Sequence, residues 1–237
     1  RSSPISVLIR VDLPALGRPI TAMRSGGARR VLGANDRIKV GFVGVGGRCR
    51  GLMEAFHANA DALNMEIGAV CDIWNKRLDS AADFVKKLTG KAPKKARNTD
   101  ELWEMEDIEA VVFATPDFQH AYHCGEAVRA GRDIYIEKPL ANRMGDAREV
   151  LKTVINSDRI VQVGTQRRSG ENYINAANYI KSGEFGKIKM VDITWNVNQP
   201  MRWRHPDTVA SLRQEDTDWN RFLVNRPYEP WNPRIYV

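Results

Sequence analysis

The chain has 237 residues, of which 43% are hydrophobic and 27% charged, and this composition predicts one or two soluble globular domains. No apolar run approaches the length of a membrane span, so no membrane partner is expected. The net charge is +7, but six Arg against two Asp fall in residues 1–36, and the nearly balanced remainder argues against a nucleic-acid partner. The three cysteines, Cys49, Cys71 and Cys124, form no C-x-x-C pair and predict neither a disulfide framework nor a metal site.

Residues 1–36 differ in composition from the rest of the chain. Prolines and glycines interrupt any periodicity there, and the segment is rich in Arg and Ser and poor in acids, as an organellar transit peptide is. We expect a disordered or leader-like extension, and we place the protein in the cytoplasm by default.

The most informative stretch follows directly and reads RIKVGFVGVGGRCRG. The apolar, β-branched run over residues 38–45 predicts a strand that is buried on both faces of a parallel sheet. The run breaks into Gly44, Gly46 and Gly47, and a helical pattern begins at Arg48. Gly44 permits a tight turn, Gly46 lets the backbone approach a ligand, and the helix N-terminus offers N–H groups to a pyrophosphate. These four residues are the first predicted cofactor-binding residues.

Cys49 stands where the third glycine of a G-x-G-x-x-G pattern falls. Its side chain is larger than a hydrogen atom, so we expect looser packing between the helix and the strand at this point. The pattern alone is weak, and a glycine-rich turn that binds no ligand is the alternative.

Residues 65–71 predict a second strand, which ends at Asp72. An acid in this place can accept hydrogen bonds from both hydroxyls of an adenosine ribose, and it repels a 2′-phosphate. Asp72 therefore favours NAD over NADP, although the nearby Lys76 and Arg77 weaken the preference and leave NADP open. The alternative is that Asp72 caps the helix that follows.

Strands and helices then alternate at short intervals. Further strands are expected near 94–97 and at 109–114, 133–136 and 160–164, and helices over 78–88, 99–103 (capped by Thr99), 121–128 and 147–155. Parallel neighbours need crossover helices, so this order predicts an α/β domain with a doubly wound parallel sheet over residues 37–164.

The pattern changes after Gly164. A helix around residues 173–180 precedes strict alternation over residues 191–197, which is typical of an antiparallel strand with one wet face. A second, α+β domain is therefore predicted over residues 165–237, and it looks incomplete because one strand cannot close a core. Residues 199–237 read mostly as loop, packed by three tryptophans, Trp203, Trp219 and Trp231.

Polar residues follow the later strands, at the sheet edge where ligands bind. Thr115 and Pro116 follow the fourth strand and are expected to line the cofactor, with Pro116 beside the nicotinamide ribose. His120 can bond a ribose or substrate hydroxyl, or it can make a purely structural bond. Glu137 and Lys138 follow the fifth strand. We expect the pKa of a partly desolvated Lys138 to fall, so that it accepts an alcohol proton while Glu137 orients the lysine or the nicotinamide.

The motifs GVGGR, CD, ATPDFQHA, YIEKPLA and VGTQRRS occur in order over roughly residues 37–200. Together they resemble the glucose–fructose oxidoreductase, inositol dehydrogenase and rhizopine-catabolism (Gfo/Idh/MocA) family. The resemblance implies a Rossmann NAD(P)-binding domain followed by an open-faced antiparallel sheet domain that carries substrate and subunit contacts, hence a homo-oligomer at full length. It also implies that Lys138 transfers the proton, that Lys138–Pro139 is a cis peptide, and that His120 and Arg168 match the family histidine and cofactor arginine.

Two further points come from the resemblance. The segment VLGAND resembles the sequence that follows the export signal in exported members, which sets a periplasmic location beside the cytoplasmic one. The family's Asp-x-x-x-His pair has no counterpart among the four histidines here, so Lys138 lacks its expected proton relay.

We therefore predict an NAD(P)-dependent oxidoreductase that acts on a sugar, cyclitol or related polyol, with NAD as cofactor and no metal. One alternative is an NAD-dependent glycosidase of the same fold. The other is a non-catalytic nucleotide-binding module, which the missing Asp-x-x-x-His pair supports.

Overall fold

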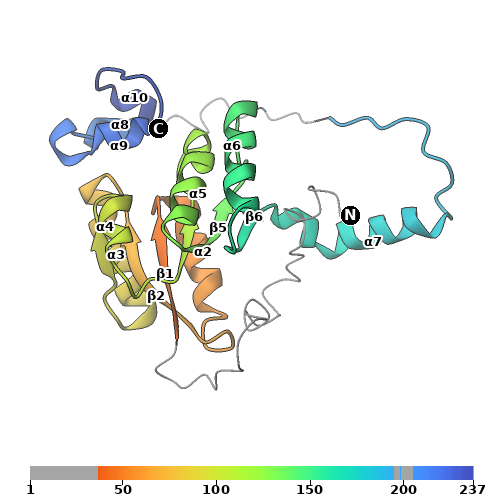
Figure 1. Cartoon of the computed structure of the whole chain (residues 1–237), viewed down its shortest axis with the longest axis horizontal. Helices are drawn as coiled ribbons and strands as arrows, with labels where there is room; N and C mark the ends of the chain where they lie inside the picture. The colour runs from red at the N-terminus through yellow and green to blue at the C-terminus, as the bar shows by residue number, and fades with distance from the viewer. Residues whose placement is uncertain (1–36, 195–197, 199–204, 237) are drawn as a thin grey trace.

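Figure 1 shows the computed structural model, which describes residues 37–194, 198 and 205–236. Its centre is a six-stranded sheet with the order β3-β2-β1-β4-β5-β6, and every pairing in it is parallel. The strands are β1 (Ile38–Val43), β2 (Met65–Cys71), β3 (Lys94–Ala96), β4 (Ala110–Phe113), β5 (Asp133–Glu137) and β6 (Val161–Gly164). The predicted doubly wound parallel sheet is confirmed, whereas the predicted extension over residues 1–36 lies outside the described residues.

Helices connect consecutive strands and cover both faces of the sheet. They are α2 (Gly47–His57), α3 (Asn75–Thr89), α4 (Thr99–Trp103), α5 (His120–Arg129) and α6 (Met144–Ile155). Strand β1 sends Phe42 into the core that α2 and α3 cover and Val43 into the core on the other side. From Val40 to Val43 both faces of β1 are buried, and this part of the strand holds no polar side chain, as the sequence predicts.

Local signals set most helix ends. Gly90, directly after α3, has a left-handed φ of 76°. Gly131, just beyond the end of α5, has a left-handed φ of 74°. The predicted cap of α4 is corrected, because the side chain of Asn98, not that of Thr99, accepts a hydrogen bond from the N–H of Glu101 at 3.0 Å. None of the helices that the structure describes is long and apolar enough to cross a membrane.

The chain leaves the sheet after β6 through a short 3-10 turn, η3 (Gln166–Ser169), and α7 (Glu171–Ser182). Helix α7 is where the sequence predicts it, but none of its residues is buried. The predicted strand over residues 191–197 is not present in its described part, residues 191–194, and the rest lies outside the described residues. A strand needs a hydrogen-bonded neighbour, and Val191 and Ile193 remain 70% and 86% exposed.

Residues 212–236, which we call the C-terminal strap, return to the sheet. After α8 (Pro206–Ser211) they form η4 (Gln214–Asp216), α9 (Trp219–Leu223) and α10 (Pro233–Tyr236), so the prediction of mostly loop is corrected. Trp219, Phe222 and Leu223 are buried against residues that follow β2 and β4. The predicted packing role is confirmed for Trp219 and Trp231, whose rings meet edge to face, while Trp203 lies outside the described residues.

Two hydrogen bonds fix the strap on the carboxyl ends of the strands. The N–H of Asp218 donates to the carbonyl of Ile73 at 2.9 Å, and the side-chain amide of Gln119 donates to the carbonyl of Phe222 at 2.6 Å. The strap therefore covers the edge of the sheet that the sequence marks as the ligand-binding edge.

Candidate functional site

The first part of the site is the glycine turn between β1 and α2. Gly44 has a φ of 73°, and a Cβ atom there would lie 2.8 Å from the backbone nitrogen of Thr115. Only glycine fits such a position without strain. Helix α2 begins at Gly47, and Gly46 precedes it without a side-chain cap, so the first N–H groups of the helix are free to meet an anion.

Cys49 is fully buried in the core beneath this turn. The predicted loosening of the helix from the sheet is not seen, because the thiol fills space between α2 and its neighbours. Burial raises the pKa of the Cys49 thiol well above its usual range, which keeps the group protonated and unreactive.

Asp72 follows β2, and its buried carboxylate faces the glycine turn. Oδ2 accepts a hydrogen bond from the Val45 N–H at 2.9 Å, and Oδ1 accepts one from the Trp74 N–H at 3.0 Å. Burial raises the pKa of the Asp72 carboxyl, while the Arg77 charge and the two N–H donors act in the opposite direction. Helix α3 has Trp74 at its N-cap, so the alternative that Asp72 caps this helix is wrong.

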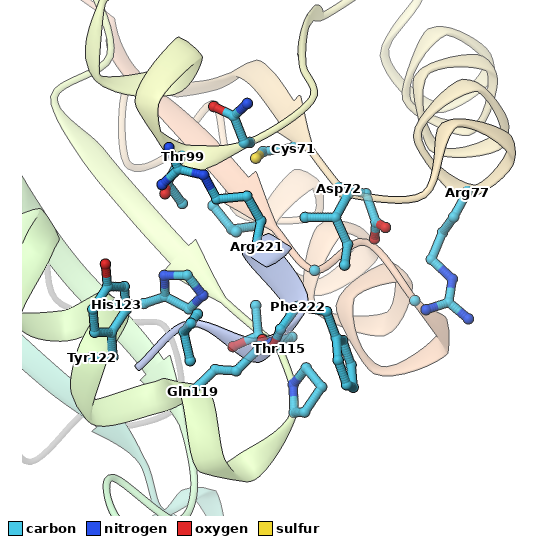
Figure 2. A pocket seen from close by; sticks show the side chains of 18 of the residues that line it. Cys71, Asp72, Arg77, Thr99, Thr115, Gln119, Tyr122, His123, Arg221 and Phe222 are labelled. Carbon is cyan, nitrogen blue, oxygen red and sulfur yellow. The ribbon is translucent and has the colours of Figure 1, made fainter. Parts of the chain in front are cut away.

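A cavity of about 310 Å³ opens beside this carboxylate, between the sheet edge and the strap. Figure 2 shows Asp72 and Arg77 on one side of the cavity and Tyr122 and His123 on the other. The predicted cofactor residues that line it are Gly44, Gly46, Asp72, Thr115 and Pro116. The cavity has the size and position of a subsite for the adenosine portion of a dinucleotide.

Thr115 lines the cavity and carries a buried hydroxyl. Its Oγ1 atom is buried and has no hydrogen-bond partner among the described residues. Buried polar atoms are nearly always paired in folded proteins, but this oxygen has almost no exposed surface, so it is enclosed by protein atoms and does not face the open part of the cavity.

The second part of the site lies two strands away, at the end of β5. Glu137 is buried, and its Oε1 atom accepts a hydrogen bond from Nε of Arg48 at 2.9 Å, with Nη2 of the same guanidinium also in contact. Its Oε2 atom accepts the N–H of Lys138 at 3.3 Å. Arg48 therefore links the glycine turn to the Lys138 segment. Arg48 and Glu137 are both predicted cofactor residues, but neither lines the cavity.

Lys138 itself is exposed, so the predicted partial desolvation is absent from the part of the chain that the structure describes. The Lys138–Pro139 peptide is cis, which confirms what the resemblance implies. Arg168 is also exposed, in η3 directly after β6, the strand next to β5. Both side chains stand at the carboxyl edge of the sheet but outside the cavity.

His120 has a different role from the predicted substrate contact. Its ring is buried, with Nδ1 2.6 Å from the carbonyl oxygen of Pro139 and Nε2 2.9 Å from that of Thr115. Each ring nitrogen thus faces a carbonyl oxygen, and whichever nitrogen carries the proton donates to a backbone group, as the structural alternative for this residue predicts. His120 joins the segment after β4 to the segment that carries Lys138.

Sequence reasoning missed the outer wall of the cavity, which comes from Arg221, Phe222 and Tyr236 of the strap. The available signal was the density of aromatic residues between Trp219 and Tyr236, which indicated packing but not the surface that they cover. No cluster of His, Cys, Asp or Glu within the described ranges could hold a metal ion.

Comparisons with known proteins show which family has a chain of this kind. A family model described as "Oxidoreductase family, NAD-binding Rossmann fold" (Gfo/Idh/MocA) matches residues 38–165, more than half of the chain. An inositol 2-dehydrogenase from Salmonella typhimurium is 28% identical over 197 residues, covering 81% of this chain and 56% of that protein. A glycosyl hydrolase family 109 protein from Shewanella pealeana is 28% identical over 191 residues, covering 78% of this chain and 40% of that protein.

Among solved structures, the WlbA dehydrogenase from Bordetella pertussis, in complex with NADH and UDP-GlcNAcA, aligns with a TM-score of 0.57 and 25% identity. The alignment covers 63% of this chain and 43% of that one. This chain thus spans 56% of the inositol dehydrogenase and 40% of the glycosyl hydrolase family 109 protein that it matches. The match to the family model lies on the sheet and on the turn that forms the site. The chain therefore belongs to the Gfo/Idh/MocA family of oxidoreductases, which has an NAD-binding Rossmann fold.

Proposed function

We propose that the protein is an NAD-dependent oxidoreductase that acts on a CH–OH group of a sugar, cyclitol or related polyol. The observation that carries the proposal is the contact between Arg48 and Glu137, which joins the glycine turn to the Lys138 segment. A dinucleotide extended along the carboxyl edge, from the cavity toward β5, would have its far end beside Lys138.

The residues present fit such a cofactor. The glycine turn and the uncapped start of α2 suit a pyrophosphate, because Gly44 and Gly46 leave the backbone bare. Asp72 suits the adenosine ribose, and Thr115 and Pro116, which follow β4 on the other side of β1, line the cavity toward the nicotinamide end. Arg168, exposed at the end of the neighbouring strand, is proposed to meet the cofactor near its nicotinamide end.

When bound, the oxidised nicotinamide supplies the acceptor for the hydride that leaves the carbinol carbon of the substrate. Nζ of Lys138 is proposed to accept the proton of the substrate hydroxyl as the hydride leaves the same carbon, so that the C–O bond becomes a carbonyl. The proton then passes to water, which has access to this exposed side chain. His120 and Glu137 hold the segment that carries Lys138.

We also propose a homo-oligomer that forms through the second domain of the complete protein. Support comes from the large apolar side chains that residues 173–193 expose, among them Met190 at 82% and Ile193 at 86%. Apolar surface of this extent on one segment is typical of a face that another part of the protein or another subunit covers.

The proposal is tested in the intact protein with a panel of inositols, sugars and other polyols, by following the formation of NADH. We expect Lys138→Met to lower kcat by about 1,000-fold, the size of a general-base contribution, with the Kd for NADH nearly unchanged. Lys152→Met, which removes an exposed lysine on α6, is the matched control. Unchanged turnover in Lys138→Met would remove this lysine from the mechanism.

The similarity to glycosyl hydrolase family 109 proteins favours one second candidate, an NAD-dependent glycosidase. The two functions differ in their net products. Release of an aryl leaving group from a glycoside without net formation of NADH would support the glycosidase. Binding of NADH with neither activity would support a nucleotide-binding module.

A further inference from the structure

Tyr236, from the last helix that the structure describes, reaches the acid at the end of β2. Its hydroxyl accepts a hydrogen bond from Nη1 of Arg77 at 2.9 Å and lies 3.5 Å from Oδ1 of Asp72. Burial raises the pKa of the Tyr236 phenol, so the group is a neutral hydroxyl that can accept from one neighbour and donate to the other. The phenol therefore bridges a carboxylate and a guanidinium at the adenosine end of the site.

Arg77 is held from three sides. Its guanidinium carbon lies 5.2 Å from the ring centre of Trp74 and 5.2 Å from that of Tyr236, so the two rings flank it. The same group lies against the glycine turn, since a Cβ atom built on Gly46 would be 3.7 Å from Nη1. The Tyr236 hydroxyl supplies the hydrogen-bond acceptor that fixes this position.

This arrangement bears on the difference between the two nicotinamide dinucleotides, which is a hydroxyl or a phosphate at the 2′ position of the adenosine ribose. Asp72 favours the hydroxyl. A free arginine beside the same acid would favour the phosphate, because a guanidinium forms charge-assisted bonds with phosphate oxygens. The sequence thus contains one residue that favours each dinucleotide, Asp72 for NAD and Arg77 for NADP. Which dinucleotide binds more tightly depends on whether another group already holds the Arg77 guanidinium.

We propose that Tyr236 is a cofactor-selectivity residue: by binding Arg77 and by placing its own hydroxyl beside Asp72, it makes the adenosine subsite selective for a free 2′-hydroxyl. The inference rests on the proposed dinucleotide site and extends it to a residue of the strap. It does not require Tyr236 to touch the reacting atoms.

The test measures binding, not turnover. In the intact protein, Kd values for NADH and NADPH are determined by titration for the unmodified protein and for Tyr236→Phe, which keeps the flanking ring and removes the hydroxyl. We expect the ratio of Kd for NADPH to Kd for NADH to fall by about tenfold, the effect of one new charge-assisted contact to phosphate. Adding Arg77→Met to Tyr236→Phe should abolish this gain, because the released guanidinium is its source.

Tyr228→Phe is the matched control, because it makes the same chemical change on an exposed residue of the same strap. It should leave the ratio of Kd values unchanged. An equal weakening of both dinucleotides in Tyr236→Phe, or an unchanged ratio, would mean that Tyr236 only packs the strap and would overturn the inference. Failure of the unmodified protein to bind either dinucleotide would instead overturn the proposed function, and this inference with it.

Discussion

The two ends of the proposed site differ in how far the described residues enclose them. At the adenosine end, Asp72 is 4% exposed and lies beneath the strap, beside a defined cavity. At the other end, Lys138 and Arg168 are exposed on the segments that follow β5 and β6. The described residues therefore enclose the proposed nucleotide end of the site, whereas the desolvation and substrate contacts that a proton-transferring lysine needs are not supplied by them.

The largest effect is expected from a substitution that disrupts the glycine turn shared by both ends of the site. Gly44→Ala should lower the free energy of unfolding by about 3 kcal/mol or more, since the new Cβ atom meets the backbone of Thr115 at a left-handed φ. It should also abolish dinucleotide binding. Gly183→Ala, at a φ of 87° but in open space, should cost only about 1 kcal/mol and leave binding intact. Thermal unfolding and NADH titration check both; equal costs would show that the contact with Thr115 does not matter.

The next largest effect should change turnover at the Lys138 end while leaving dinucleotide binding at the adenosine end nearly unchanged. Arg48→Met leaves Glu137 buried without its cation, so the Lys138 segment should shift and kcat should fall by about tenfold to 100-fold. The Kd for NADH should change by less than about threefold, because Arg48 does not line the adenosine cavity. Arg48→Lys should restore part of the turnover.

Arg50→Met is the matched control for this change, since Arg50 lies on the same helix and bonds the hydroxyl of Ser80 at 2.8 Å. It should leave kcat unchanged. If Arg48→Met mainly raised the Kd for NADH, Arg48 would instead be the cofactor ligand that the sequence predicts, and the contrast between the two ends would weaken.

The smallest effect should lie away from both ends, in the segment before β4. Lys94 and Lys39 bond the Asp107 carboxylate at 2.8 and 3.0 Å and lower its pKa to about 2. The folded pKa is below the unfolded value, so this stabilisation is present above about pH 4 and is lost as the pH falls toward 2. Asp107→Asn should therefore lower the free energy of unfolding by less than about 1 kcal/mol at neutral pH.

Denaturant unfolding at several pH values checks this prediction. The difference between Asp107→Asn and the unmodified protein should shrink between about pH 4 and pH 2, as the native carboxylate becomes protonated. Dinucleotide binding and turnover should not change. A difference that stays constant down to pH 2 would mean that the two lysines do not stabilise the charged form.

The sheet could be predicted from the sequence because its information is local. Residues 65–71 are mostly apolar and include the β-branched Ile67 and Val70, and Gly90 ends a clear helical stripe, so pattern and turn chemistry agree. The placement of Gly44 and Asp72 side by side was also predictable, since it follows from the backbone at the ends of adjacent strands. The bonds of His120 were not, because a histidine at a helix start gives no sign of which carbonyl oxygens will face its ring.

The strap could not be predicted for a related reason. Helices α9 and α10 have only five and four residues, too few to show a helical period. Their stability comes from long-range contacts such as Phe222 against Phe118, with ring centres 5.5 Å apart. The selectivity role proposed for Tyr236 depends on such a contact, so no motif in the sequence marks it.

The strap is synthesised after every strand of the sheet, so it can dock only after the sheet has left the ribosome. Tyr236, the hydrogen-bond partner of Arg77, is synthesised 159 residues after it, so their contact can form only late in synthesis. A nascent chain can fold its sheet first and still present an unclosed edge, with Ile73 and Phe118 uncovered, to chaperones and proteases. Truncation before residue 212 is thus expected to give a folded sheet that is degraded faster and holds nucleotide poorly.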